Sequence, residues 1–230
     1  MAIGTLAEKS LHAALKLHYA LPGDLLETPL DGYVIDILRP VDGAASPYQC
    51  IEIQTKNLAQ MKPKLLKLVE KYPMRVVHPV AQARHVVRVD SDGVILSRRK
   101  TPMKGTVYHV FPELLTLTAL IPHPNFSLEV LLIHEEQVWL DDGRGSWRRK
   151  HWSIHDRRLL SVGEAIRLET LEDFVALLPP ELETEFETVA LAKALRLQRP
   201  LAGKMAYCLR QMGVIEVCGK RGRAYVYRRV

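Results

Sequence analysis

Two acidic residues lie inside apolar segments near the start of the chain. Asp36 stands in the segment YVIDIL (residues 33–38) and Glu52 in the segment CIEIQT (residues 50–55). Both segments are rich in β-branched residues, which predicts strands. A carboxylate buried in a strand is costly unless it is paired or holds a cation. Two neighbouring strands would bring these carboxylates together, and a hard divalent ion such as Mg²⁺ would offset their repulsion.

The residues around Glu52 extend this candidate metal site. Glu52 and Gln54 are two residues apart, so they project from the same face of a strand. We expect the Asp36 and Glu52 carboxylates, with the Ile53 carbonyl, to hold Mg²⁺ or Mn²⁺, which would activate water against a phosphodiester. The alternative is an Asp near a turn and a surface Glu, both on edge strands and without a metal.

The surrounding sequence predicts the elements that position these residues. Thr5 and Glu8 fit a capping box at the start of a helix. An amphipathic run after Glu52 predicts a second helix, beginning near Lys62 because Pro63 suits a first turn. The expected order is helix over residues 5–20, strands over 33–38 and 48–55, helix within 57–71 and strand over 74–80. The strand–helix–strand step predicts a parallel pair with a right-handed crossover.

This order and these acids resemble the PD-(D/E)XK nuclease superfamily over about residues 5–80. The motif is short and degenerate, but order, burial and spacing agree. The resemblance implies an α/β fold with a restriction-endonuclease-like mixed sheet flanked by helices. It also implies that Asp36 and Glu52 are the metal ligands. The family's lysine two residues after the Glu is Gln54 here, a departure that some restriction endonucleases share.

The resemblance also implies supporting residues. A neutral Gln54 would orient a water or a phosphate oxygen, and the missing positive charge would come from Lys64, our first choice, or from Lys56 or Lys67. The alternative for the helix lysines is a solvated face. Glu8 either assists metal binding or serves only as the capping-box partner of Thr5. The predicted catalytic set is Glu8, Asp36, Glu52, Gln54 and Lys64.

The C-terminal segment is strongly basic. From Arg196 onward, nine Lys or Arg residues face one acid, Glu216. A helix over 200–212 and two strands around a basic turn give the order of a winged helix-turn-helix, which residues 184–230 resemble. This predicts a small α+β winged-helix domain. Candidate nucleic-acid contacts are Arg199, Lys204 and Arg210 on the helix and Lys220, Arg221 and Arg223 at the wing tip. The alternatives are a protein-contact module and a solvated basic surface.

Two further basic clusters lie between these regions. Residues 97–105 predict a compact loop after a hairpin, with Arg98, Arg99, Lys100 and Lys104 as candidate phosphate contacts. Arg148, Arg149 and Lys150 lie between Trp147 and Trp152. We expect the tryptophans to anchor the core above a basic rim; the alternative is stacking on unpaired bases. The predicted parts are a nuclease core over 1–110, a middle region over 111–183 and the winged helix over 184–230.

The bulk composition fits a nucleic-acid enzyme. The 230 residues carry a net charge of +6, and 47% are hydrophobic, as in ordinary globular proteins. No apolar run reaches the roughly 18 residues of a membrane span, and no secretory signal opens the chain, so we expect a cytoplasmic protein without a membrane partner. The three cysteines show no metal spacing.

The sequence thus predicts a Mg²⁺-dependent deoxyribonuclease, an endonuclease that acts on double-stranded DNA. Whether it works as a homodimer is left open. The alternative is a DNA-binding regulator or assembly subunit with an inactive nuclease core. RNA as the substrate is a third reading, because basic charge does not distinguish the two polymers.

Overall fold

The computed structural model describes residues 10–43 and 46–230. Glu8 and Thr5, predicted at the start of the first helix, lie outside the described residues. The described part of that helix, α1, spans Ser10–Tyr19. Among the described residues, no helix is both long and apolar enough to cross a membrane.

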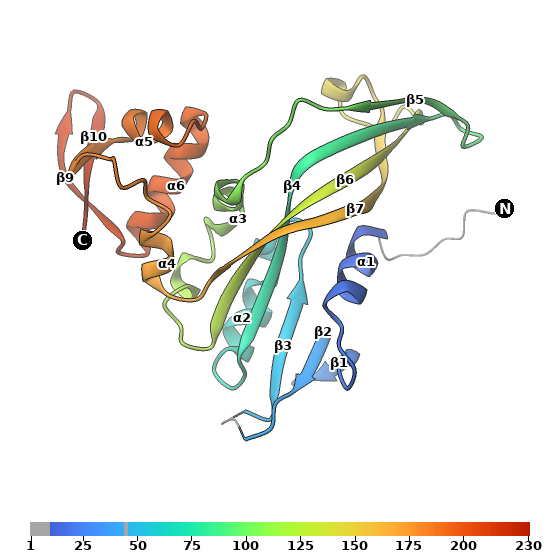
Figure 1. Ribbon diagram of the computed structural model, residues 1–230, viewed down its shortest axis with the longest axis horizontal. Helices are drawn as coiled ribbons and strands as arrows, with labels where there is room; N and C mark the ends of the chain where they lie inside the picture. Colours follow the sequence, from blue (N-terminus) through green and yellow to red (C-terminus); the bar gives the residue numbers. More distant parts are fainter. Residues whose placement is uncertain (1–9, 44–45) are drawn as a thin grey trace.

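A seven-stranded mixed sheet forms the body of the protein (Figure 1). Six strands follow the order β1-β2-β3-β4-β6-β7, and β5 pairs with the far end of β4. The strands are β1 (Leu25–Leu30), β2 (Tyr33–Pro40), β3 (Tyr48–Ile53), β4 (Met74–Val89), β5 (Ile95–Lys100), β6 (Phe126–Leu140) and β7 (Ser153–Leu168). Helices lie against this sheet, so the predicted α/β class with a mixed, helix-flanked sheet is confirmed.

The predicted crossover is present. β3 and β4 are parallel neighbours, and the chain between them forms a 3-10 helix, η1 (Leu58–Met61), followed by α2 (Lys62–Leu68). Pro63 lies in the first turn of α2, where the N–H that proline lacks has no helical partner anyway. This step fixes α2 over β3, the strand that carries Glu52.

Two edge strands of the main path, β1 and β7, were not predicted. The side chains of β1 are mostly exposed, and those of β7 are exposed or half-buried except for the buried Leu168 at its end. An edge strand needs no continuous apolar run, so its sequence lacks the pattern of a buried strand. β1 joins β2 through Asp31 and Gly32, both with positive φ (49° and 87°), as a two-residue hairpin turn requires.

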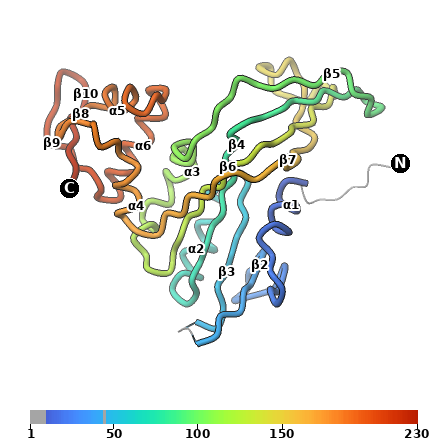
Figure 2. The backbone as a smooth tube through the Cα atoms, in the orientation of Figure 1, coloured from blue at the N-terminus to red at the C-terminus, as the bar shows by residue number. Residues whose placement is uncertain are grey.

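The predicted boundary at residue 110 divides strands that belong together. β4 and β6 are paired in parallel from Met74 to Val89, and β6 pairs with β7. Residues 111–183 therefore supply two strands of the large sheet rather than a separate region. Figure 2 shows these long strands running side by side away from the C-terminal module. Parallel pairing over long sequence distances leaves no local signal in the chain.

Two apolar clusters cover the two faces of the sheet. On one face, Leu11 and Leu15 of α1 pack on Ile37, Ile51 and Ile53. The larger cluster on the other face joins α2, β4 and β6 to the later helices. Those helices are η2 (Val107–Val110), α3 (Phe111–Leu114), η3 (Thr118–Leu120) and α4 (Leu171–Val175).

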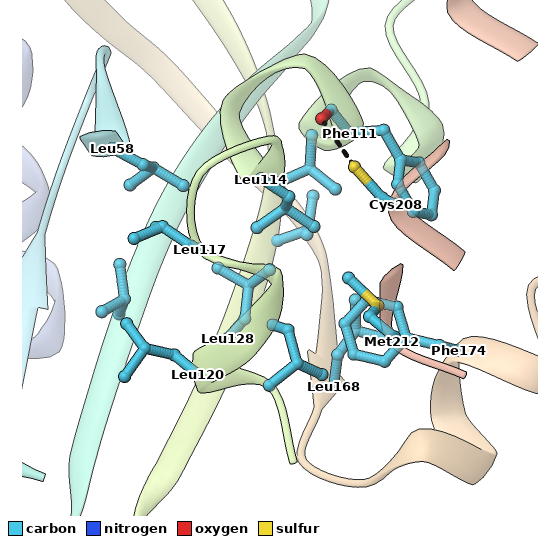
Figure 3. Packing of buried hydrophobic residues seen from close by; sticks show 14 of the residues in the cluster. Leu58, Phe111, Leu114, Leu117, Leu120, Leu128, Leu168, Phe174, Cys208 and Met212 are labelled. Atoms are coloured by element: carbon cyan, nitrogen blue, oxygen red, sulfur yellow. Dashed lines mark hydrogen bonds between the residues drawn. The ribbon is translucent and has the colours of Figure 1, made fainter. Parts of the chain in front are cut away.

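A C-terminal module packs on this larger cluster. It contains β8 (Glu185–Glu187), α5 (Thr188–Ala194), α6 (Arg199–Gln211), β9 (Ile215–Arg221) and β10 (Ala224–Arg229). The three strands form a separate antiparallel sheet in the order β8-β10-β9, of which β8 was not predicted. Cys208 of α6 donates to the Phe111 carbonyl at 3.5 Å, and Met212 lies beside Phe174 (Figure 3). The module is thus anchored to the body by buried contacts.

Candidate metal-binding site and basic surfaces

Asp36 lies where strands β2 and β3 separate. The antiparallel ladder between them ends at the pair Ile37–Ile51, so Asp36 and Glu52 are the next opposed positions. Beyond this point, the Ile53 N–H donates to Asp36 Oδ2 at 2.8 Å. The Asp36 carboxylate therefore accepts a backbone hydrogen bond across the place where the two strands separate, which we call the β2–β3 fork. The two strands bring the predicted acids to one place.

His12 of α1 also contacts Asp36. Its Nε2 lies 3.2 Å from Asp36 Oδ2. Burial raises the pKa of Asp36, but the hydrogen bonds from His12 and from the Ile53 N–H outweigh it and hold the pKa below its ordinary value. Asp36 is therefore anionic at neutral pH. His12 is not among the site residues predicted from the sequence; its place beside Leu11, in the apolar stripe of α1, was the available signal.

Glu52 is paired with Lys64 of α2. Glu52 is only 5% exposed, and Lys64 Nζ lies 2.5 Å from its Oε1. Burial raises the pKa of Glu52 to about 7; Lys64 opposes this shift, and the nearby charge of Asp36 adds to it. Lys64 Nζ also donates to the Val34 carbonyl of β2 at 2.5 Å. The ammonium group thus bridges the two strands of the fork.

The donor set suits a hard divalent ion. Within residues 10–43 and 46–230, no three His, Cys, Asp or Glu side chains converge, so the side-chain ligands of the described site would be Asp36 and Glu52. Mg²⁺ commonly uses one or two carboxylates and completes its shell with water and substrate phosphate. These two residues therefore fit Mg²⁺ or Mn²⁺, with the Ile53 carbonyl as the predicted third ligand.

Gln54 is engaged with its own loop. Its Nε2 donates to the Lys56 carbonyl at 2.7 Å and to the Asn57 carbonyl at 3.4 Å. Asn57 has a φ of 56° and directly precedes η1. The Gln54 carboxamide therefore holds the turn that leads to α2 and Lys64. His78 Nδ1 lies 2.7 Å from the Gln54 carbonyl oxygen and supports the same segment.

The other two candidate lysines lie elsewhere. Lys67 Nζ donates to the Asp31 carbonyl at 2.9 Å and lies 5.3 Å from the centre of the Tyr33 ring. Lys56 is exposed and lines a pocket beyond the end of β3. Of the three, Lys64 alone makes an ion pair with Asp36 or Glu52 among the described residues.

The basic segments of the middle region differ from their prediction. Arg98, Arg99 and Lys100 belong to strand β5 instead of a loop, because the extended end of β4 supplies a pairing partner. Arg98 is bound to Glu136 at 2.8 Å. Lys104 lies in the segment between β5 and η2.

Trp147 does not anchor the core. It is 74% exposed, with the Arg148 guanidinium 5.5 Å from the centre of its ring. It lies in a 3-10 helix, η4 (Trp147–Arg149), which continues into Lys150 with a φ of 51°. Trp152 is half-buried, 5.0 Å from the Arg88 guanidinium. The chain segment before β7 therefore exposes the Trp147 side chain to solvent.

The predicted basic residues of the C-terminal module lie on α6 and on the β9–β10 hairpin. Arg199 begins α6, and Lys204 follows one turn later. The Arg210 guanidinium lies 5.8 Å from the Tyr207 ring centre, and Lys220 Nζ lies 5.1 Å from that of Tyr225. At the hairpin tip, Arg221 pairs with Glu187 at 3.0 Å, and Arg223 is exposed.

Comparison with known proteins gives a family and one relative. A family model described as "Domain of unknown function (DUF8091)" matches residues 9–169, a range that ends just after β7. An uncharacterized protein of Treponema pallidum (strain Nichols) is 30% identical over 235 aligned residues, which cover all of this chain and 88% of that protein. No solved structure matches.

Proposed function

The chain belongs to the DUF8091 family, whose function is unknown, and for this member we propose metal-dependent cleavage of phosphodiester bonds in DNA. One observation carries the proposal: Asp36 and Glu52 occupy the opposed positions just beyond the last β2–β3 pair, Ile37–Ile51, and Lys64 binds Glu52. A buried acid and a half-buried acid beside one cation suit the binding of a divalent ion and a phosphate. The order of α1, β2, β3, α2 and β4 supports a restriction-endonuclease-like core.

The residues of the fork have distinct tasks in this proposal. A bound Mg²⁺ would polarise the scissile phosphate and lower the pKa of a coordinated water. Asp36 is held in place by His12 and the Ile53 N–H. Glu52 loses its proton when a cation binds, because the cation replaces part of the solvation that burial removed. Lys64 supplies a positive charge for a phosphate oxygen.

The C-terminal module would place the enzyme on duplex DNA. Helix α6 and the basic β9–β10 hairpin support a winged-helix assignment for residues 184–230. The candidate contacts are Arg199, Lys204 and Arg210 on α6 and Lys220, Arg221 and Arg223 at the hairpin tip. Arg98, Arg99, Lys100, Lys104, Arg148, Arg149 and Lys150 add positive charge on the body. Such charge attracts the DNA backbone without reading its sequence.

One observation favours a second candidate function. The Gln54 carboxamide is bound to the Lys56 and Asn57 carbonyls, so the position that carries a lysine in the nuclease superfamily contributes a loop contact here. A core without that cation would suit a DNA-binding regulator or assembly subunit that does not cut.

Cleavage assays on the full chain distinguish the two candidates. Wild type, Asp36→Ala and Glu52→Ala are incubated with linear, supercoiled and branched DNA, with and without Mg²⁺ or Mn²⁺. Each substitution depletes the ion's shell, so a loss of at least about 10²-fold is expected. Asp31→Asn is the control, since Asp31 is an acid in the β1–β2 turn, bound to Lys71. Unchanged cutting by both site variants would refute the metal site. A wild type that binds DNA but never cuts would favour the second candidate.

A further inference from the structure

A fully buried carboxylate, that of Glu135, binds two arginine side chains. All three residues are far from Asp36 and Glu52 in the sequence. Glu135 of β6 has an exposed fraction of 0%. Its Oε1 accepts from Arg84 Nε at 2.5 Å, and its Oε2 accepts from Arg157 Nε at 2.9 Å and Nη2 at 2.6 Å. Gln137 Nε2 donates to the same carboxylate at 3.1 Å. The remaining Nη1 of Arg157 donates to the Thr55 carbonyl at 3.1 Å.

This arrangement leaves a positive charge at the surface. Two guanidinium groups share one carboxylate, so one charge is uncompensated. Both arginines line an open pocket of about 520 Å³, together with Lys56 and Arg149. Glu113 is the one acid in that lining, and it already accepts the Leu58 N–H at 2.9 Å. His78 also lines the pocket. Burial lowers its pKa, so its imidazole is neutral at pH 7 and adds no charge to the pocket.

A contribution to folding stability does not by itself explain the burial of Glu135 between Arg84 and Arg157. Burying a carboxylate between two guanidinium groups costs solvation, and an apolar replacement is often as stable. The guanidinium group of arginine suits phosphate because it offers several N–H donors in one plane. Within residues 10–43 and 46–230, neither Nη atom of Arg84 hydrogen-bonds to the protein. Glu135 thus orients a donor group that has capacity for an anion.

A second open pocket continues from the first. It measures about 560 Å³ and shares Met103 and His109 with the first pocket. Its basic residues are Lys104, Arg196 and Lys204, and its lining includes the start of α6. Because they share two lining residues, the two pockets lie next to each other, and we refer to them together as the basic groove; its lining includes the arginine pair at one end and the start of α6 at the other. Thr55 and Lys56, three and four residues after Glu52, lie in the lining of the first pocket.

We propose that the Arg84–Arg157 pocket binds a backbone phosphate of a nucleic-acid strand that follows this groove. The inference rests on the nucleic-acid binding of the proposed function but not on its cleavage. It assigns a task to Glu135, which is a positioning residue: it holds the guanidinium groups of Arg84 and Arg157 together in the lining of the pocket.

Binding without cutting tests the proposal. The full chain with Asp36→Ala, in the absence of divalent ions, is titrated with a fluorescent single-stranded DNA of about ten nucleotides. Arg149→Gln removes a lining cation without touching Glu135, and Arg144→Gln is the matched control, because Arg144 is an exposed arginine of the same segment that lies in neither pocket lining. We expect at least a fivefold loss of affinity for the first and less than about twofold for the second, because only the first loses a phosphate contact.

A second variant and a second probe address the arginine pair itself. Arg84→Gln should weaken binding about tenfold and reduce the salt slope by about 0.7, the value for one phosphate contact on a single strand. Thermal melting checks that the variant is folded. Inorganic phosphate should compete with the DNA in the parent but not in Arg84→Gln. Equal losses for Arg149→Gln and Arg144→Gln, or an unchanged salt slope in folded Arg84→Gln, would overturn the proposal. A chain that binds as expected but never cuts would overturn the nuclease proposal alone.

Discussion

Lys64 and Glu52 form an ion pair between helix α2 and strand β3, with Nζ 2.5 Å from Oε1. The same Nζ contacts the Val34 carbonyl of β2, so one ammonium group connects α2 to both strands of the fork. The crossover from β3 through α2 places this cation over the acid pair. This position supports the proposal that Lys64 supplies the charge that Gln54 lacks.

Removal of Lys64 should impair cleavage far more than removal of Lys67. We expect Lys64→Ala to slow single-turnover cleavage by at least about 10²-fold, because one charge beside the phosphate is lost in a poorly solvated site. Lys67→Ala should stay within about threefold, since Lys67 contacts Asp31 and Tyr33. Melting curves check both variants for folding. Similar rates for the two variants would show that the position of Lys64 has no catalytic importance.

The stability of the metal-free protein should fall as pH rises from about 4.5 to about 7. Burial raises the pKa of Glu52 in the folded chain from its ordinary value of 4.5 to about 7. In this window the unfolded chain has released the proton that the folded chain still holds, so rising pH favours unfolding, by up to about 1.4 kcal/mol per pH unit. Urea unfolding at several pH values measures the slope. Glu52→Gln, which cannot titrate, should remove this part of the slope; an identical slope in wild type and variant would exclude a raised pKa.

Gln54 should act on position more than on charge. Gln54→Ala removes the hydrogen bonds to the Lys56 and Asn57 carbonyls, which loosens the turn before α2. We expect slower cleavage with DNA affinity within about twofold of wild type, because a small misplacement of a catalytic group costs rate. Gln54→Lys should be tolerated or faster, since it adds a cation on the same strand. If Gln54→Lys cuts where the wild type never does, the natural chain is a binding module.

The β9–β10 hairpin should contribute salt-dependent DNA affinity. The double variant Lys220→Gln/Arg223→Gln should weaken duplex binding and reduce the slope of log affinity against log salt by about 1.8, or about 0.9 for each lost phosphate contact. Arg228→Gln is the control, because Arg228 on β10 is bound to Glu216 at 2.6 Å. Fluorescence anisotropy at several salt concentrations gives both slopes. A double variant that behaves like Arg228→Gln would indicate a protein-contact hairpin.

Local sequence predicted the strands that carry Asp36 and Glu52, and the helix that carries Lys64. Short apolar runs rich in β-branched residues mark buried strands, and Pro63 marks the first turn of α2. These signals are local because each depends on residues within one element. The parallel pairing of β3 with β4 followed from the helix between them, since a short crossover restricts the topology. The charge of the C-terminal segment was equally readable, because charge depends on composition alone.

Tertiary structure alone decided which distant residues meet at these elements. His12 reaches Asp36 because α1 packs across the sheet. Glu135 of β6 binds Arg84 of β4 and Arg157 of β7, the strands on either side of it. The registers of β4, β6 and β7 set those contacts, and a shift by one residue would turn each side chain to the other face. No local period in the chain records such a register. The acids of the fork and Lys64 could therefore be named from the sequence, whereas the contacts of His12 and of Glu135 could not.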